Sequence, residues 1–239
     1  MKKLLVALSV SALLGGVAQA SDWGYEGEHG PAHWGSVSKT CAEGVNQSPI
    51  DITRVAQSQL EPLNIHYTGK VTALTNNGHT LQATVTGDNT LTIDGDVFEL
   101  KQFHFHTPSE NFINHHQYAL EAHFVHADKD GNLAVVAVMY DAGSDDADLD
   151  KLTAKIPSVN ETQTLATSFD VKEMLPTSVA KYYRFNGSLT TPPCSEGVRW
   201  FVIKQHKTLS SDQEKAFSSV MGHNNRPLQG LHARIADAN

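Results

Sequence analysis

The chain has little cysteine, no long apolar run after residue 17, and no cluster of basic residues. Without such a run, no later segment is long enough to cross a bilayer as a helix. Acidic residues outnumber basic ones by 26 to 18, and without a basic cluster nucleic acid and anionic membranes are poor candidate partners. No internal repeat, low-complexity tract or linker divides the 239 residues, so we expect one sizeable domain.

The N-terminus has the features of a secretory signal peptide. Two lysines precede an apolar run that ends at Val17, and Ala18-Gln19-Ala20 has the small residues of a cleavage site. Cleavage after Ala20 changes the formal charge from −8 to −10, because two lysines are removed. We therefore predict a signal peptide over residues 1–20, a single folded domain over residues 21–239, and a periplasmic or secreted location.

Cys41 and Cys194 are the only cysteines. In an oxidising compartment one disulfide is the simplest interpretation, and two free thiols are the alternative. A bridge that closes so long a loop would stabilise the fold by about 4–5 kcal/mol in the chain-entropy description.

Turn signals at short intervals predict a β-rich fold. Over residues 63–100, the turns Asn76-Asn77-Gly78, Gly87-Asp88-Asn89 and Asp94-Gly95-Asp96 separate short runs of Thr, Val, Leu and Ile. Residues 133–140 are apolar on both faces, as in a central buried strand. We predict a mainly β (α+β) domain around a central, mostly antiparallel twisted β-sheet with short peripheral helices.

Helices are expected in only three short segments. Two candidates are residues 146–156 and 170–175. The third begins at Ser211-Asp212-Gln213-Glu214, which has the pattern of a capping box, and reaches about Met221.

Two short patterns place three histidines where they can meet. In an extended strand, Gln102, His104 and His106 share one face, while the two intervening phenylalanines share the other. A second predicted strand puts Glu121 and His123 on one face, so antiparallel pairing would bring the three imidazoles together.

Three neutral imidazoles suit Zn²⁺ and leave one coordination position open, which is typical of a catalytic site. Gln102 and Glu121 flank the candidate ligands and can accept hydrogen bonds from the free ring N–H groups. The alternative is ordinary: the chain has 13 histidines, and a His-x-His pair alone is more often a surface or core feature than a ligand pair.

The segment Ser188-Leu189-Thr190-Thr191-Pro192-Pro193 predicts a stiff loop, and by itself it is simply a rigid turn. Together with the histidine patterns and three N-terminal motifs, it makes the chain resemble an α-class carbonic anhydrase of the bacterial, exported type. Those motifs are Trp23-Gly24-Tyr25, Asn46-Gln47-Ser48-Pro49-Ile50 and Asn77-Gly78-His79. The resemblance runs in order along nearly all of residues 21–239.

The resemblance implies zinc-dependent, reversible hydration of carbon dioxide to bicarbonate, by attack of zinc-bound hydroxide. It implies His104, His106 and His123 as zinc ligands, with Gln102, Glu121 and the backbone around Asn224 supporting them. Thr190 matches the family's gatekeeping threonine and Glu110 its carboxylate partner. Cys41 and Cys194 match a disulfide of extracellular members.

An apolar wall for carbon dioxide is also implied by the resemblance; without it, ordinary core packing would be preferred for each member. The wall comprises Val125, Val135, Leu189, Val198 and Trp200, with Thr191 at its polar edge.

His79 matches the family's proton-shuttle histidine, since an imidazole can accept and release a proton near neutral pH. Tyr25, Asn77 and Gln82 match polar residues along its water path. From the residues alone, His79 is a solvent-exposed histidine beside an Asn-Gly turn.

Three further features follow from the comparison with the family. The resemblance implies cis peptide bonds at Ser48-Pro49 and Pro192-Pro193 and makes a homodimer possible. Well-known members have aromatic or His residues at the positions of Thr107, Asn111 and Asn225. We therefore expect a different set of hydrogen bonds around Glu110.

Two other functions are compatible with the same residues. One is an exported zinc esterase, which would need a wider acyl pocket. The other is a non-catalytic, carbonic-anhydrase-like binding module, which would be signalled by loss of a ligand histidine.

Overall fold

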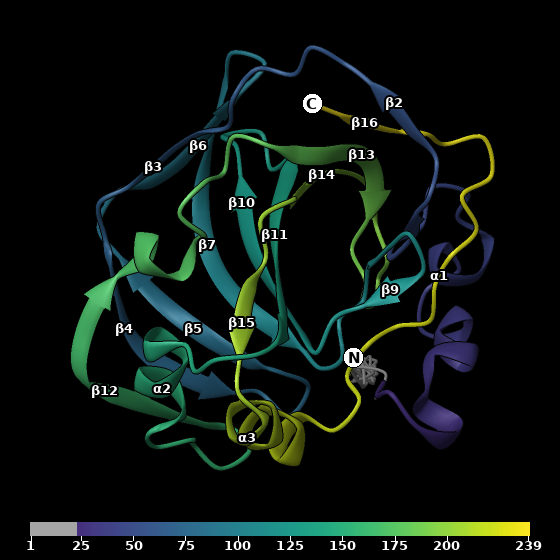
Figure 1. Ribbon diagram of the computed structural model, residues 1–239. Coiled ribbons are helices and arrows are strands. Elements are labelled where there is room, and N and C mark those ends of the chain that lie inside the picture. Colours follow the sequence, from purple (N-terminus) through teal and green to yellow (C-terminus); the bar gives the residue numbers. More distant parts are fainter. Residues whose placement is uncertain (1–22) are drawn as a thin grey trace, which may run out of the picture.

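A twisted β-sheet crosses the centre of the molecule, and short helices lie at its periphery (Figure 1). The structure is a computed structural model that describes residues 23–239, so the predicted signal peptide lies outside the described residues. The predicted mainly β class is confirmed. No helix within residues 23–239 is long and apolar enough to span a membrane.

The large sheet has 13 strands in the order β12-β4-β5-β7-β10-β11-β14-β13-β16-β2, with β3, β6 and β15 attached at the side. Most pairs are antiparallel, and the pairs β11·β14, β11·β15 and β16·β2 are parallel. The strands are β2 (Val55–Gln57), β3 (Asn64–Tyr67), β4 (Lys70–Asn76), β5 (Leu81–Thr86), β6 (Asn89–Ile93), β7 (Asp96–His106), β10 (Leu120–Ala127), β11 (Leu133–Ala142), β12 (Glu161–Asp170), β13 (Tyr182–Ser188), β14 (Glu196–Ile203), β15 (Lys207–Leu209) and β16 (Ala236–Ala238).

A second, small sheet lies beside the large one and has three strands in the order β1-β8-β9. Its strands are β1 (Asp51–Ile52), β8 (Phe112–Ile113) and β9 (His116–Gln117).

Strand β11 divides the core into two clusters, as its apolar sequence predicts. Val136 and Tyr140 face the larger cluster, whereas Val135 and Met139 face the smaller one on the other side of the sheet. Period-two alternation explains this division, because successive side chains of a strand point to opposite faces. The strand is therefore buried on both faces, as expected for residues 133–140.

The same alternation in β7 orients the histidine pair. Phe103 and Phe105 are fully buried in the larger cluster, and burying such a ring stabilises a fold by roughly 1.5–3 kcal/mol. Because these rings fix one face of the strand, His104 and His106 must point to the other face. The core therefore sets the direction of the candidate ligands.

Two of the three predicted helices are shorter than expected, whereas the third spans the predicted residues 211–221. Asp146 is the N-cap of α2 and accepts hydrogen bonds from two backbone N–H groups of the first turn, so the helix begins after it. Within the predicted segment 170–175, only residues 171–174 are helical, as a 3₁₀-helix with a capping box between Asp170 and Glu173. The helices are α1 (Thr40–Glu43), α2 (Ala147–Thr153), α3 (Ser211–Met221) and the 3₁₀-helices η1 (Gly27–His29), η2 (Pro31–Ser36) and η3 (Val171–Met174).

The predicted capping box of α3 was wrong by one residue. Ser210, not Ser211, is the N-cap, and it exchanges hydrogen bonds with Gln213 instead of Glu214. Gln213 is also buried against α2, where its amide binds the backbone of Asp146. This tertiary contact selects the Ser210 register, since both serines are suitable caps.

The expected cis peptide bonds at Ser48-Pro49 and Pro192-Pro193 are present, and Thr107-Pro108 is a third one that was not predicted.

Candidate metal centre

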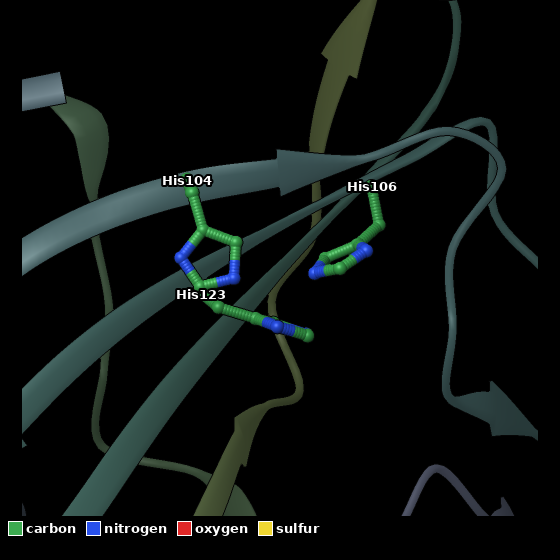
Figure 2. A group of neighbouring side chains, drawn as sticks. All are labelled: His104, His106 and His123. Atoms are coloured by element: carbon green, nitrogen blue, oxygen red, sulfur yellow. The ribbon is translucent and has the colours of Figure 1, made fainter. Parts of the chain in front are cut away.

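Three histidines from β7 and β10 converge at one point (Figure 2). The strands pair antiparallel with His123 directly opposite His104 and Glu121 opposite His106, as the sequence pattern required. One ring nitrogen of each residue lies within 4.8 Å of the others. The predicted ligand set is therefore brought together by strand register alone.

Hydrogen bonds fix which nitrogen of two of these rings faces the centre. Nδ1 of His106 lies 2.7 Å from the backbone carbonyl oxygen of Asn224, which can only accept, so Nδ1 carries the hydrogen. Nδ1 of His104 lies 2.9 Å from Oε1 of Gln102, which likewise accepts. Both rings therefore direct the lone pair of Nε2 towards the centre. In metal sites, a ligating imidazole typically donates its other ring N–H to a carbonyl or carboxylate oxygen in this way.

His123 is oriented the other way round. Its Nε2 lies 2.9 Å from Oε1 of Glu121, so Nδ1 is the nitrogen left to face the centre. The angle of this contact falls outside good hydrogen-bond geometry. Gln102 and the backbone of Asn224 thus each hydrogen-bond one histidine, and Glu121 lies beside the third.

Burial favours the neutral form of two candidate ligands, His104 and His106. Burial lowers the pKa of His104 well below its usual value, and the neighbouring histidines lower it further. Burial also lowers the pKa of His106. Neutral imidazole is the form that binds a metal.

One further observation indicates that the site fits a divalent metal ion. Nε2 of His106 is buried and has no hydrogen-bond partner within residues 23–239. A buried polar nitrogen without a partner is costly, whereas a metal ion at the centre would use its lone pair. Three neutral nitrogen ligands are a donor set typical of catalytic zinc.

Glu121 is held as a carboxylate by a dense set of donors. The backbone N–H groups of Glu110 and Asn111 donate to its Oε2 over 2.7 and 2.9 Å, and the Asn111 amide donates to Oε1 over 2.8 Å. Burial raises the pKa of Glu121, but His123 and these bonds outweigh it and leave the pKa below the usual value. Asn111 thus donates two of the hydrogen bonds that hold Glu121.

Glu110 is fully buried beside the histidines. Its Oε1 accepts a 2.8 Å hydrogen bond from the backbone N–H of Arg226. Burial raises its pKa to about 7, against the opposing effects of His123, this N–H and the Thr190 hydroxyl. Oε2 of Glu110 has no partner in full hydrogen-bond geometry within residues 23–239. The Thr190 hydroxyl favours the carboxylate form of Glu110.

The predicted apolar wall lies against His123. The rings of His123 and Trp200 meet edge to face, with centroids 4.9 Å apart. Val135 and Val198 are buried in the same cluster as Trp200, and Val125 and Leu189 pack against it partly buried. All five predicted wall residues are therefore contiguous.

A cavity of about 160 Å³ is lined by two of the three histidines, His104 and His106. It brings together the predicted proton-path residues and the polar edge of the wall. The lining includes Tyr25, Asn77, His79, Gln82 and Thr191, together with His104 and His106.

Trp23 is a part of this cavity to which the sequence interpretation assigned no role. Its ring stacks on that of His79 with centroids 3.9 Å apart and an interplanar angle of 7°. The Trp23-Gly24-Tyr25 motif was the available signal, but the motif alone does not say which ring Trp23 meets. Asn77 shapes the adjoining turn, since its Oδ1 accepts from the backbone N–H groups of His79 and Thr80.

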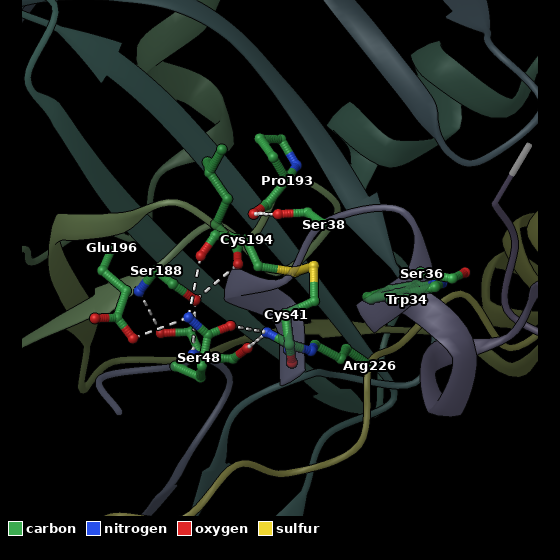
Figure 3. Close-up of a disulfide and its surroundings, with 12 residues drawn as sticks. Trp34, Ser36, Ser38, Cys41, Ser48, Ser188, Pro193, Cys194, Glu196 and Arg226 are labelled. Carbon is green, nitrogen blue, oxygen red and sulfur yellow. Dashed lines mark hydrogen bonds between the residues drawn. A yellow bond between two sulfur atoms is a disulfide. The ribbon is translucent and has the colours of Figure 1, made fainter. Parts of the chain in front are cut away.

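The predicted disulfide between Cys41 and Cys194 is present (Figure 3). It ties the loop after Thr190 to helix α1. Arg226, buried nearby, is a second residue without a predicted role, because an isolated arginine in a C-terminal loop has no sequence pattern that reports burial.

Known proteins resemble this chain over nearly its whole length. A family model described as eukaryotic-type carbonic anhydrase matches residues 29–238. A carbonic anhydrase of Klebsiella pneumoniae is 48% identical over 242 residues, covering 98% of this chain and 96% of its own. One from Pectobacterium atrosepticum is 46% identical over 241 residues, covering 98% of each chain. The solved Photobacterium profundum alpha-carbonic anhydrase is 57% identical, with a TM-score of 0.89, and covers 90% of this chain and 100% of its own.

Proposed function

The chain belongs to the eukaryotic-type, or α-class, carbonic anhydrase family and hydrates carbon dioxide reversibly, and we propose that His104, His106 and His123 hold the zinc for this reaction. The observation that carries the proposal is the unpartnered, buried Nε2 of His106, which lies among two other ligand nitrogens. When bound by three neutral imidazoles, zinc supplies a Lewis acid that makes water acidic enough to lose a proton near neutral pH.

Thr190 and Glu110 orient the nucleophile through the direction of their hydrogen bonds. In its ionised form Glu110 can only accept, so the Thr190 hydroxyl would donate its hydrogen to Glu110 and offer a lone pair to the nucleophile. Thr190 would thus accept a hydrogen bond from the nucleophile and aim it at the carbon atom of carbon dioxide. The backbone N–H of Thr190 is the donor for the developing negative oxygen of bicarbonate.

The substrate needs an apolar surface next to the nucleophile, because carbon dioxide is small and has no strong hydrogen-bonding group. Val135, Val198 and Trp200 form that surface beside His123. Thr191 supplies a polar edge where bicarbonate leaves for solvent.

His79 accepts the proton that each cycle must release. It lines the same cavity as His104 and His106, and Tyr25, Asn77 and Gln82 also line that cavity. Water held by these polar groups connects the centre with His79, and the imidazole passes the proton to buffer at a similar free energy in both steps.

The proposed function includes export of this protein from the cytoplasm. The chain begins with a signal-peptide pattern, and its two cysteines form a disulfide, which persists in an oxidising compartment. The homodimer suggested by the family resemblance stays a prediction.

The test is stopped-flow hydration of carbon dioxide by purified residues 21–239, before and after zinc chelation and restoration. We expect rapid hydration that disappears with the metal and returns with it. His106→Ala should lose both hydration and stoichiometric zinc, measured by mass spectrometry of the metal. His66→Ala is the matched control, because His66 is exposed on β3, and it should leave both unchanged.

Zinc bound at one ion per chain by the His106→Ala variant with wild-type affinity would overturn the proposed ligand set. A folded, zinc-loaded wild-type chain without hydration activity would bring the esterase or binding-module interpretation forward.

A further inference from the structure

Arg226 connects the two residues that orient the nucleophile, and we propose that it is a positioning residue for the Thr190–Glu110 pair. Its side chain is 3% exposed, which is unusual for arginine, and it lies against the face of Trp34. The inference rests on the proposed roles of Thr190 and Glu110.

The backbone of Arg226 holds Glu110 directly. Its N–H donates to Oε1 of Glu110 over 2.8 Å, and both groups are buried. The position of this N–H depends on the side chain of Arg226, because the side chain anchors the same residue to Gln47, Ser48 and Cys41.

The guanidinium of Arg226 binds three neutral acceptors (Figure 3). Nη1 donates to Oε1 of Gln47 over 2.9 Å and to the carbonyl oxygen of Ser48 over 2.8 Å. Nη2 donates to the carbonyl oxygen of Cys41 over 3.0 Å. Since the acceptors carry no charge, the guanidinium acts here as a rigid fork of donors that fixes geometry.

The segment held by Arg226 in turn holds the loop that carries Thr190. The backbone N–H of Ser48 donates to Oγ of Ser188 over 2.9 Å, and the backbone N–H of Ser188 donates back to Oγ of Ser48 over 3.2 Å. The Gln47 amide donates to the carbonyl oxygen of Cys194 over 3.0 Å. Both ends of the loop 188–194 are therefore tied to residues 47–48.

Close backbone approach makes this connection stiff. A Cβ atom at Gly187 would lie 2.1 Å from Oγ of Ser48, so residue 187 must be glycine for the two segments to meet as they do. Ser48 is itself fully buried. A displacement of residues 47–48 is therefore transmitted to the Thr190 loop through short, buried hydrogen bonds and close packing.

The prediction for Arg226→Lys follows from geometry. A lysine keeps the charge but has one nitrogen on a flexible stem, so it cannot reproduce three donors in a plane. Glu110 and Thr190 then lose their common anchor, and small misplacement of an orienting group lowers the rate strongly. We expect kcat/KM for carbon dioxide to fall by about tenfold or more with one zinc per chain retained.

The decisive experiment is a double-mutant cycle with Thr190→Val, with kcat/KM, zinc content and unfolding midpoint measured for each zinc-loaded full-length mature variant. If Arg226 acts through Thr190 and Glu110, the Arg226→Lys change should cost less than about twofold in kcat/KM once Thr190 is valine. A purely structural role would not give this dependence. The same fold-loss in both backgrounds, or no loss in either, overturns the inference.

A second variant covers the case in which Arg226→Lys does not fold. Ser48→Ala removes one hydroxyl of the reciprocal Ser48–Ser188 pair and leaves all three guanidinium bonds in place. It should show the same dependence on Thr190, and an effect independent of Thr190 counts against the inference.

Arg234→Lys is the matched control, because Arg234 also binds backbone carbonyls, those of Asn186, Gly230 and Leu231, but lies half exposed. It should leave kcat/KM within about twofold of wild type. A Thr190→Val variant with wild-type kcat/KM would overturn the proposed function of Thr190. If Thr190→Val is impaired but the effects of the two substitutions on kcat/KM simply add, only the positioning role of Arg226 is overturned.

Discussion

His126 and Tyr67 share a hydrogen bond inside the larger core cluster, with 2.6 Å between Nε2 of the imidazole and the phenolic oxygen. Nδ1 of His126 faces the carbonyl oxygen of Ala134 at 3.2 Å, so Nδ1–H donates there and Nε2 accepts from the tyrosine. Burial raises the pKa of Tyr67 well above its usual value, which keeps the phenol protonated as the donor.

This pair predicts an acid-sensitive component of stability. Burial lowers the pKa of His126 from 6.5 to about 4, so the unfolded chain binds a proton that the folded chain rejects. His126 therefore makes its full contribution to the free energy of unfolding above pH 6.5. This contribution falls by about 3 kcal/mol as the pH drops towards 4.

Urea unfolding of the zinc-loaded protein at several pH values between 4 and 7 measures this component. The difference between wild type and His126→Leu should grow as the pH rises from 4 to 6.5 and stay constant above it. A difference independent of pH would show that His126 titrates normally in the folded protein.

His79→Ala should slow proton release without affecting the attack on carbon dioxide. A general acid or base group contributes about 10²–10⁴-fold, and buffer can replace part of it, so we expect kcat to fall about 10- to 100-fold in weak buffer. kcat/KM should stay close to wild type. Stopped-flow assays over a range of buffer concentrations separate the two, and an unchanged buffer dependence would remove His79 from the role.

Val135→Phe should obstruct the apolar wall. Val135 is 2% exposed and lies opposite Trp200 in the β11·β14 register, so a larger ring projects into the space beside His123. We expect kcat/KM to fall by more than about tenfold, with a stability cost of about 1–3 kcal/mol.

Val136→Phe is the control for this variant, because it makes the same change on the opposite face of β11. It should have a similar stability cost and unchanged kcat/KM per zinc-loaded molecule. Equal losses of activity in the two variants would mean that Val135 acts only through folding.

Breaking the disulfide should destabilise the fold and loosen the Thr190 loop. The double variant Cys41→Ser, Cys194→Ser opens a loop spanning 153 residues, for which we expect a loss of about 2–5 kcal/mol in the free energy of unfolding. Denaturant unfolding of the variant and of reduced wild type should give the same loss. A reduced wild type as stable as the oxidised protein would contradict the prediction.

Local periodicity was sufficient to predict the face of each ligand strand, because alternation at Gln102, His104 and His106 is a property of a single strand. The roles of Thr190 and Glu110 came from the resemblance, since nothing in their spacing joins them. Neither approach found the Arg226 fork or the His126–Tyr67 bond, because each joins residues 59 or more positions apart through burial that only the folded chain defines. The Ser210 cap was missed for the same reason, as its choice depends on contact between α2 and α3.

The register of β7 and β10 makes the metal centre a reporter of folding. His104 stands directly opposite His123, and a slip of one residue would turn one of them towards the phenylalanine side of the sheet. Such a molecule can be compact and still lack the centre. Tightly bound zinc per chain therefore counts the molecules in a preparation whose central strands are correctly paired, and a fraction that cannot be loaded measures misregistered protein that spectroscopy of secondary structure would overlook.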